Sequence, residues 1–247
     1  MLLDLWQNVL ISPILWLLLF LTKLLFNNLG LGILALTLSM RLVLTPLTLP
    51  SLKAAQKQKE LSGELNKLKV LYKDDKKKLA EEQLALMRKH GVNPAAGCLP
   101  QVFQIIFLLA LYQVFIKVLG FDGRSGTPAI PAEYSFIRTH FLYLDLLKKD
   151  PFIILPGLAG ASQFLMTKMM LPGVKKSESL AKETEDKSDD LMYNMQEQML
   201  YLGPAMTVLI SWNLPSGLVL YWFATTVFSI LQQRLMLGRP SEKVLKI

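Results

Sequence analysis

Apolar residues occur along the chain in five long runs, which cover residues 29–49, 98–116, 152–171, 199–212 and 218–236. An α-helix rising about 1.5 Å per residue needs about 20 residues to cross the roughly 30 Å hydrocarbon core of a bilayer. Four of the runs are long enough. The pattern therefore predicts an all-α integral membrane protein with five transmembrane helices. The fourth run spans only about 21 Å, so we expect it among the other helices or in locally thinned lipid.

The N-terminal segment, residues 1–28, is also apolar, but it is interrupted. The interrupting residues are Asp4, Gln7, Asn8, Pro13 and Lys23. The uninterrupted part covers only residues 14–21, and a run that short is more often interfacial than spanning. We therefore predict an N-terminal interfacial amphipathic helix, with a sixth span as the alternative. The acidic start and the lack of a small-residue cleavage pattern argue against a signal peptide.

Lysine and arginine positions predict the orientation of the chain, because positively charged loops stay in the cytoplasm. Residues 51–94 carry 11 Lys and Arg residues, whereas residues 120–150 carry four. We therefore expect the segment after the first span and the C-terminus in the cytoplasm, with the N-terminal helix on the outer face.

The hydropathy and charge patterns together predict nine segments. Leucines at helical spacing, including Leu61, Leu65 and Leu68, predict that the basic segment is a helical hairpin. The stretch 177–190 is dense in Ser, Glu, Asp and Lys, which is typical of a solvated flexible loop. The predicted segments are 1–28 (interfacial helix), 29–50 (first span), 51–95 (cytoplasmic basic hairpin), 96–119 (second span), 120–150 (extracytoplasmic loop), 151–171 (third span), 172–195 (cytoplasmic loop), 196–237 (fourth and fifth spans) and 238–247 (cytoplasmic tail).

Arg41 is the most informative single residue, because it lies well inside the first apolar run. A charge at that depth costs about 2.5 to 3.5 kcal/mol on insertion scales and indicates a functional site. The five apolar runs contain no Asp or Glu that could neutralise it. Water, carbonyl groups, neutral polar side chains or a visiting ligand are then left to interact with Arg41.

Neutral polar residues on the other spans could form a hydrated cavity around Arg41. They include Gln104, Gln163, Thr167 and Thr225. The alternative is that Arg41 extends to the cytoplasmic interface while the Gln and Thr groups bond between helices. Methionines such as Met166 and Met170 could likewise form an adaptable apolar surface or serve as ordinary packing. These residues alone leave both alternatives open.

Composition and motifs exclude several kinds of chemistry. The chain of 247 residues is 52% apolar with a formal charge of +8, so an anionic lipid surface is a better partner than nucleic acid. The single cysteine, Cys98, excludes an intrachain disulfide and a cysteine-cluster metal site. The sequence has no phosphate-binding loop, no H-E-x-x-H motif and no hydrolase-like spacing. We therefore predict a protein that is not an enzyme, hydrolyses no ATP and holds no cofactor or metal.

Residues 91–115, GVNPAAGCLPQVFQIIFLLALYQVF, contain an Asn-Pro-x-x-Gly-Cys-x-Pro segment followed by an apolar span. This block resembles the hallmark segment and second conserved span of the YidC/Oxa/Alb family of membrane proteins. Further similar blocks are MR at residues 40–41 with TPLT at 45–48, YLDL at 143–146 with DPFIILP at 150–156, LPSGLVLYW at 214–222, and QQ at 232–233. The resemblance covers residues 5–237 in the family's order.

This resemblance implies a membrane protein insertase and chaperone of the bacterial plasma membrane. Its hydrophilic groove, open to cytoplasm and lipid, would be centred on Arg41 and include Gln104, Gln163, Thr167, Trp222 and Thr225. The client's apolar segment would slide along Phe107, Tyr112, Met166, Met170 and Phe223. Implied partners are newly made membrane proteins and the lipid bilayer, with a Sec translocon, signal recognition particle or its receptor, and ribosome as further candidates. A small-solute channel and a purely structural lipid-binding protein are the alternative functions.

The chain departs from the family pattern at three places. Thr167 stands where many members have Gln, and Gln163 lies one turn earlier, which affects the predicted groove wall. The acidic loop 177–190 is longer than in many relatives. The tail after Arg239 is short, which affects the predicted attachment to the ribosome. The large extracytoplasmic domain of some bacterial members is not present in this sequence. The absence of a transit-type leader favours a bacterial over an organelle membrane.

Overall fold

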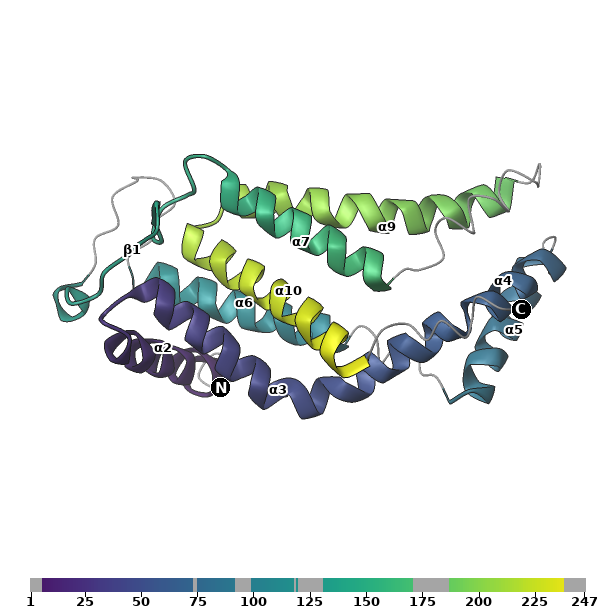
Figure 1. The fold of residues 1–247 in the computed structure, drawn as a ribbon, viewed down its shortest axis with the longest axis horizontal. Helices are drawn as coiled ribbons and strands as arrows, with labels where there is room; N and C mark the ends of the chain where they lie inside the picture. Colours follow the sequence, from purple (N-terminus) through teal and green to yellow (C-terminus); the bar gives the residue numbers. More distant parts are fainter. Residues whose placement is uncertain are drawn as a thin grey trace. The chain divides into compact units, whose positions relative to one another are not determined.

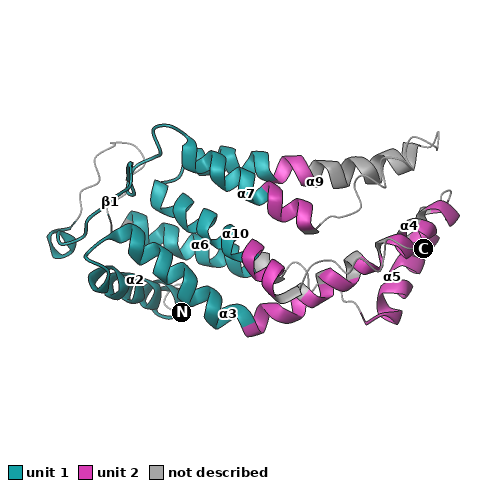
Figure 2. Cartoon of the chain, viewed as in Figure 1, with its two compact units in different colours: residues 1–45, 101–163, 204–229 teal, residues 46–100, 164–203, 230–247 magenta. Residues whose placement is uncertain are grey.

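The computed structural model describes residues 6–72, 75–91, 99–117, 119, 131–170 and 187–237. These residues are mostly helical (Figure 1). The chain divides into two compact units, shown in Figure 2. Unit 1 comprises Met1–Thr45, Gln101–Gln163 and Pro204–Ser229, and unit 2 comprises Pro46–Pro100, Phe164–Gly203 and Ile230–Ile247.

The N-terminal segment forms a helix with two parts. A π-helical turn, η1 (Trp6–Ile11), leads into α2 (Ser12–Leu24), where Pro13 occupies a first-turn position that needs no backbone donor. The combined stretch Trp6–Leu24 is long and apolar enough to cross a membrane, by length and composition. An interfacial position and a sixth span therefore both stay predictions.

Helix α3 (Leu29–Glu60) is longer than the first span predicted from hydropathy. It starts at Asn28, whose side-chain Oδ1 accepts a hydrogen bond from the Leu31 N–H at 3.1 Å. It then continues through Pro46 and Pro50, so the predicted boundary at residue 50 is not a break in the helix. Pro46 and Pro50 lack the N–H groups that would donate to the Leu42 and Pro46 carbonyls. One residue before the first of these carbonyls, the Thr45 hydroxyl donates to the Arg41 carbonyl at 2.7 Å.

The remaining long helices follow the other apolar runs. They are α6 (Leu99–Lys117), α7 (Ile154–Met170), α9 (Lys187–Trp212) and α10 (Ser216–Leu237). Helix α9 begins before its apolar run, so the part of the predicted flexible loop at residues 187–195 is helical instead. Residues 171–186 of that loop, and the Asn93-Pro94 and Cys98 motif positions, lie outside the described residues.

Unit 1 is built around one apolar core to which α2, α3, α6, α7 and α10 all contribute. Glycines allow close approach between these elements. Gly32 of α3 lies against Thr22 of α2, Gly160 of α7 lies against Val208 of α9, and Gly217 of α10 lies against Phe115 of α6. The completely buried members of the core include Leu18, Leu29, Ile33, Leu36, Leu111, Val114, Phe115, Leu146 and Leu218.

The segment 131–153 folds over one end of unit 1. It contains the 3₁₀ turn η3 (Ala132–Tyr134) and two short antiparallel strands, β1 (His140–Phe141) and β2 (Leu144–Asp145), paired His140 with Asp145. We predicted only a loop here, because strands of two residues leave no recognisable hydropathy pattern.

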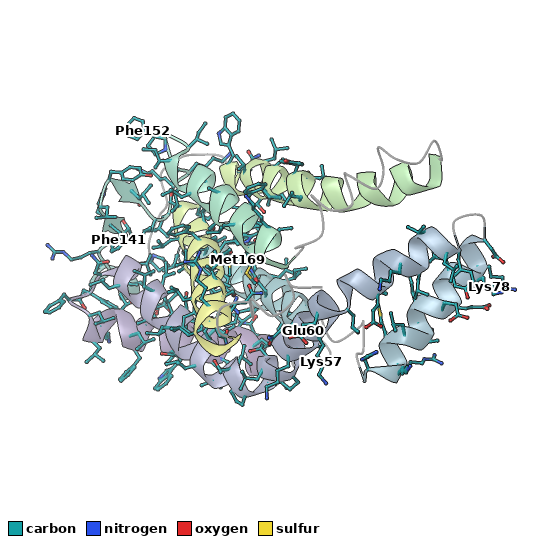
Figure 3. The ribbon with its side chains drawn as sticks, turned by 45° about the vertical axis from the view of Figure 1, so that its right-hand side comes forward. Lys57, Glu60, Lys78, Phe141, Phe152 and Met169 are labelled. Atoms are coloured by element: carbon teal, nitrogen blue, oxygen red, sulfur yellow. The ribbon has the colours of Figure 1, made fainter. Side chains whose placement is uncertain are left out.

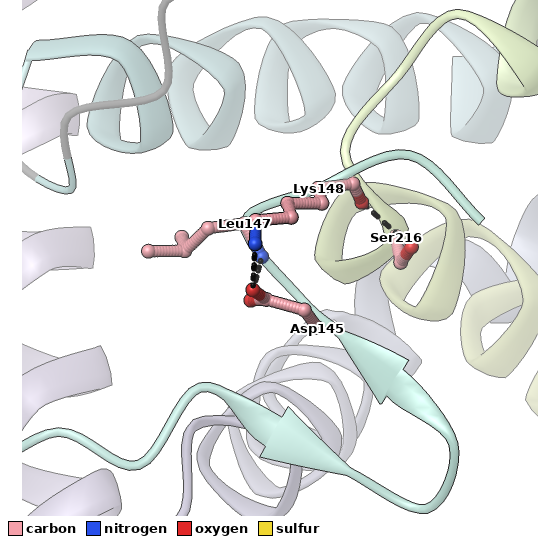
Figure 4. Close-up of polar contacts among 4 residues, drawn as sticks. All are labelled: Asp145, Leu147, Lys148 and Ser216. Carbon is pink, nitrogen blue, oxygen red and sulfur yellow. Dashed lines mark hydrogen bonds and ion pairs between the residues drawn. The ribbon is translucent and has the colours of Figure 1, made fainter. Parts of the chain in front are cut away.

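This segment is bonded to the start of α10, as Figure 4 shows. The Ser216 N–H and hydroxyl both donate to the Lys148 carbonyl at 2.7 Å, and the Gly217 N–H donates to the Leu146 carbonyl at 2.9 Å. Asp145 stabilises the same turn by accepting a hydrogen bond from the Leu147 N–H at 3.3 Å. The first N–H groups of α10, which have no partner inside the helix, are thereby satisfied.

Asp150 joins this segment to α7 and is almost fully buried. Its carboxylate accepts hydrogen bonds from the Leu155 N–H at 2.7 Å, the Phe152 N–H at 3.0 Å and the Tyr143 hydroxyl at 3.1 Å. Partial burial and, after it, the bond to Asp150 raise the pKa of the Tyr143 phenol. Tyr143 therefore remains a neutral donor at physiological pH.

We expect Asp150→Ala to destabilise unit 1 by about 1–3 kcal/mol, because it leaves buried N–H groups without an acceptor. Thermal unfolding in detergent should show this as a lower midpoint. Asp150→Asn, which keeps one acceptor oxygen, should have an unfolding midpoint between those of the wild type and the alanine variant. Equal midpoints for wild type and the alanine variant would contradict this role.

Unit 2 contains α4 (Ser62–Leu71) and α5 (Lys76–Lys89), which lie side by side. Helix α5 starts at Asp75, whose carboxylate accepts from the Lys78 N–H at 3.0 Å, and it is followed by Gly91 in a left-handed conformation (φ 65°). His90 and Glu64 connect the far ends of the two helices at 3.9 Å. Lys78, labelled in Figure 3, lies 5.3 Å from the Tyr72 ring centroid. The cytoplasmic position of this helical pair stays a prediction.

Candidate functional site

Arg41 lies on the apolar part of α3, within unit 1, and its side chain is half-buried. Among the described residues, its guanidinium makes no hydrogen bond and no ion pair. A cation in an apolar helix with no protein counter-charge is costly, which indicates a functional role. The expectation that Arg41 has no acidic partner stays a prediction.

Tyr221 of α10 lies close enough to Arg41 for a charge on either residue to affect the other. Tyr221 is buried, and its ring packs against Phe107 of α6 with a centroid distance of 5.1 Å and a tilt of 30°. Arg41, Tyr221 and Phe107 therefore bring α3, α10 and α6 together at one place in unit 1. A phenol offers an oxygen to the guanidinium without a competing negative charge.

Helix α10 also presents polar atoms that lack partners. Trp222 Nε1 and Thr225 Oγ1 are buried and have no hydrogen-bond partner among the described residues. Thr225 lies beside the Tyr221 phenol, but not in hydrogen-bond geometry. By contrast, Thr226 and Ser229 donate to their own helix, to the Trp222 and Thr225 carbonyls at 3.0 and 2.9 Å. Gln233 Oε1 farther along α10, Trp6 Nε1 and Thr22 Oγ1 are also without a partner among the described residues. Unpaired buried polar atoms are uncommon in folded proteins, so the two close to Tyr221 indicate a polar site.

The residues predicted from the sequence divide between the two units. Unit 1 contains Arg41, Gln104, Phe107, Tyr112, Gln163, Trp222, Phe223 and Thr225. Gln104 and Gln163 are half-buried, and Gln163 already has an interaction partner, as does Thr167. Thr167, Met166 and Met170 belong to unit 2, so the structure does not bring them together with Arg41 within one unit. The Met170 side chain lies outside the described part of the chain.

The sequence analysis missed Tyr221, although the residue lies within the LPSGLVLYW block. No periodicity distinguishes it from its apolar neighbours, and only the packing of α3 and α10 shows that it meets Arg41. Within the described residues, no group of three or more His, Cys, Asp or Glu could hold a metal ion. The predictions of no metal, no cofactor and no catalysis stay predictions.

The fold and the site together define a class of protein. Apolar helices long enough to cross a membrane, with a half-buried arginine within one of them, are typical of an integral membrane protein. Residues 20–243 match the family described as 60Kd inner membrane protein. The chain therefore belongs to this family, which is the YidC/Oxa/Alb family that its motifs resemble. Its members act as insertases rather than as catalytic enzymes.

Relatives from three bacteria agree with this assignment. Membrane protein insertase YidC of Fusobacterium nucleatum is 36% identical over 207 residues, which are 84% of this chain and 85% of that protein. Membrane protein insertase MisCA of Bacillus subtilis is 33% identical over 243 residues, or 96% and 81% of the two chains. Membrane protein insertase YidC of Wolinella succinogenes is 34% identical over 207 residues, which are 84% of this chain but 33% of that protein.

Proposed function

We propose that this protein is a membrane protein insertase and chaperone that works without ATP hydrolysis. The observation that carries the proposal is the Arg41 side chain, half-buried in an apolar helix and without an acidic partner among the described residues. The relatives' names, which describe membrane protein insertases, support it. An arginine whose charge is not neutralised internally is available to attract the acidic or polar tail of a client.

The attraction is large enough to matter. Opposite charges 4 Å apart at an effective dielectric constant of 20 attract by about 4 kcal/mol. That offsets much of the free energy needed to bring a client carboxylate into the membrane. Trp222 Nε1 and Thr225 Oγ1, unpaired among the described residues, offer a donor and a hydroxyl to the same polar tail.

In this mechanism Arg41 lies in a hydrophilic groove that is open to the cytoplasm and to lipid. Gln104, Gln163, Trp222 and Thr225, which share unit 1 with Arg41, form the polar wall. The client's apolar segment moves along Phe107 and Tyr112 of α6 and Phe223 of α10. Tyr221 joins the predicted set as a buried phenol of α10 close to Arg41.

We further propose five spans, with the α4–α5 pair and the C-terminus in the cytoplasm of a bacterial cell and the N-terminal helix on the outer face. The apolar part of α9, Leu200–Trp212, is short for a span. At about 1.5 Å per residue it covers roughly 20 Å, which favours thinner lipid beside it and a lower barrier to client passage. Newly made membrane proteins are the clients. A Sec translocon, signal recognition particle or its receptor, and ribosome are candidate partners.

Reconstitution tests this function directly. Liposomes containing only the purified full-length protein should insert a single-span client with an acidic N-terminal tail, measured as protease protection of that tail, without ATP. We expect protection well above that in empty liposomes. Protection equal to empty liposomes would contradict autonomous insertion. Solute flux through the same vesicles would instead favour the channel alternative.

A further inference from the structure

One end of unit 1 exposes large apolar side chains that no described residue covers. Phe26, between α2 and α3, is 80% exposed, Leu142 at the β1–β2 turn is 84% exposed, and Phe152 just before α7 is 68% exposed. Hydrogen bonds place the first two turns together, because the Arg138 N–H donates to the Asn27 carbonyl at 2.7 Å and the Asn28 amide to the His140 carbonyl at 3.5 Å. The Tyr143 ring, 6.0 Å from that of Phe152, connects the β1–β2 turn with the start of α7. We call Phe26, Leu142 and Phe152 the apolar tip.

Two members of the apolar tip have an unusual backbone. Phe26 and Leu142 adopt φ angles of 59° and 55°, in the left-handed region that glycine and asparagine adopt most readily. A turn facing water normally carries such turn-forming residues. The chain instead has bulky apolar residues at both turns. Such residues disfavour positive φ angles, and their side chains are exposed to solvent. Local violations of this kind concentrate at functional positions.

Residues next to the apolar tip pack against the helices of unit 1. Phe141, next to Leu142, packs onto Gly30 of α3, and the Tyr143 ring lies 6.0 Å from the Phe152 ring. The Tyr143 hydroxyl is in turn bonded to the buried Asp150 carboxylate. Figure 3 shows Phe141 directed toward the helices and Phe152 projecting from the end of the unit. The exposed side chains are therefore held outward by defined contacts.

The surroundings of the apolar tip match the interface of a membrane. Tyr143 has an apolar ring outside and a bonded hydroxyl inside, and the exposed Lys148, Lys149 and Arg138 lie in the same segment. Aromatic residues with nearby cations are typical of positions at the depth of lipid headgroups. Helix α7 starts two residues after Phe152, and its first turns expose Ile154 and Leu158. The apolar surface of this span thus continues into the apolar tip.

We propose that Phe26, Leu142 and Phe152 insert into the lipid interface and anchor this end of unit 1 in the membrane leaflet it faces. The insertion sets the depth at which α3, α7 and α10 begin. This inference depends on the membrane location of the protein and not on client insertion, so it can fail while the proposed function stands.

The test measures the depth of the apolar tip in vesicles of phosphatidylethanolamine and phosphatidylglycerol. Full-length protein with Cys98→Ser and Leu142→Cys carries an environment-sensitive fluorophore at residue 142. The control carries the same fluorophore at Lys77→Cys, an exposed position of α5. We expect a lipid with a spin label near its headgroup to quench the fluorophore at residue 142 severalfold more strongly than the fluorophore at residue 77. Aqueous iodide should show the opposite order. Equal iodide quenching at both positions, or shielding of residue 142 from both quenchers by a protein partner, overturns the proposal.

A second variant separates lipid contact from folding. Leu142→Asn suits the left-handed turn, so the unfolding midpoint in detergent should not fall. A fluorophore at Phe152→Cys should nevertheless lose part of its lipid quenching in the Leu142→Asn background, because the neighbouring anchor is gone. A lower midpoint with unchanged lipid quenching would show that Leu142 is structural and overturn the proposal.

Discussion

Arg41→Ala should reduce insertion of clients with acidic translocated tails by about tenfold, the effect of losing roughly 1.4 kcal/mol of attraction. This loss is well below the attraction of about 4 kcal/mol at a dielectric constant of 20, because water and the client's other contacts replace part of that attraction. The measurement is the initial rate of protease protection in liposomes containing the wild-type or variant protein. A client identical except for a neutral tail should be affected much less.

Two further substitutions at this position separate charge from shape. Arg41→Lys should retain most of the insertion of acidic clients, because the positive charge remains. Arg41→Glu should insert acidic clients more slowly than Arg41→Ala does, because like charges repel. If acidic clients insert equally with alanine, lysine and glutamate at residue 41, charge attraction is wrong for them. The structural lipid-binding alternative would then gain support.

Gly217→Ala should lower the stability of unit 1 by about 1–3 kcal/mol, the usual range for overpacking a filled core. A Cβ at this position would lie 2.5 Å from Phe115 Cζ and 3.1 Å from the Leu146 carbonyl oxygen. The Phe115 ring is completely buried and Leu146 is held by its bond to the Gly217 N–H, so neither moves away easily. We expect the midpoint of thermal unfolding in detergent to fall by about 5 °C.

Gly157→Ala is the matched control for this prediction. Gly157 lies in α7, and a Cβ added there would meet nothing within 4 Å. Alanine favours a helix over glycine by about 0.5–1 kcal/mol, so this variant should unfold at the same or a slightly higher temperature. Equal losses at residues 157 and 217 would show that the close contact with Phe115 is not the cause.

A substitution at Gly217 should affect function as well as stability, because α10 also carries Tyr221, Trp222 and Thr225. The bonds from Ser216 and Gly217 to the β1–β2 segment determine where α10 begins. A helix displaced at its start carries its later side chains along. We therefore expect Gly217→Ala to reduce insertion of acidic clients as well, although less than Arg41→Ala does.

Much of the fold could be predicted from hydropathy. Lipid excludes polar side chains over a length set by the bilayer, so the apolar runs near α6, α7 and α10 are visible without any knowledge of contacts. Arg41 stood out for the same reason, as a charge where the surroundings are apolar. The family could be predicted as well, because its motifs occur in order along the chain, and the match over residues 20–243 confirmed it.

Hydropathy did not show where each helix itself begins and ends. Helix α3 continues through Pro46 and Pro50 into the basic segment, although its membrane-capable part, Leu29–Ser51, agrees with the predicted first span. Helix α9 begins at Lys187, before its apolar run. Hydropathy reports the solvent around a side chain, and a helix that leaves the lipid changes solvent without ending. The two-residue strands β1 and β2 were invisible because they depend on contacts with distant residues.

Which residues meet was decided by tertiary packing alone. Tyr221 and Trp222 are adjacent aromatic residues in an apolar run, and nothing in their spacing shows that Tyr221 interacts with Arg41 while Trp222 Nε1 stays unpaired. The rotation of each helix about its axis determines this, and that rotation follows from close contacts such as Gly217 with Phe115. The chain therefore specifies its apolar helices and its buried charge locally, whereas the partners of that charge depend on how the helices pack.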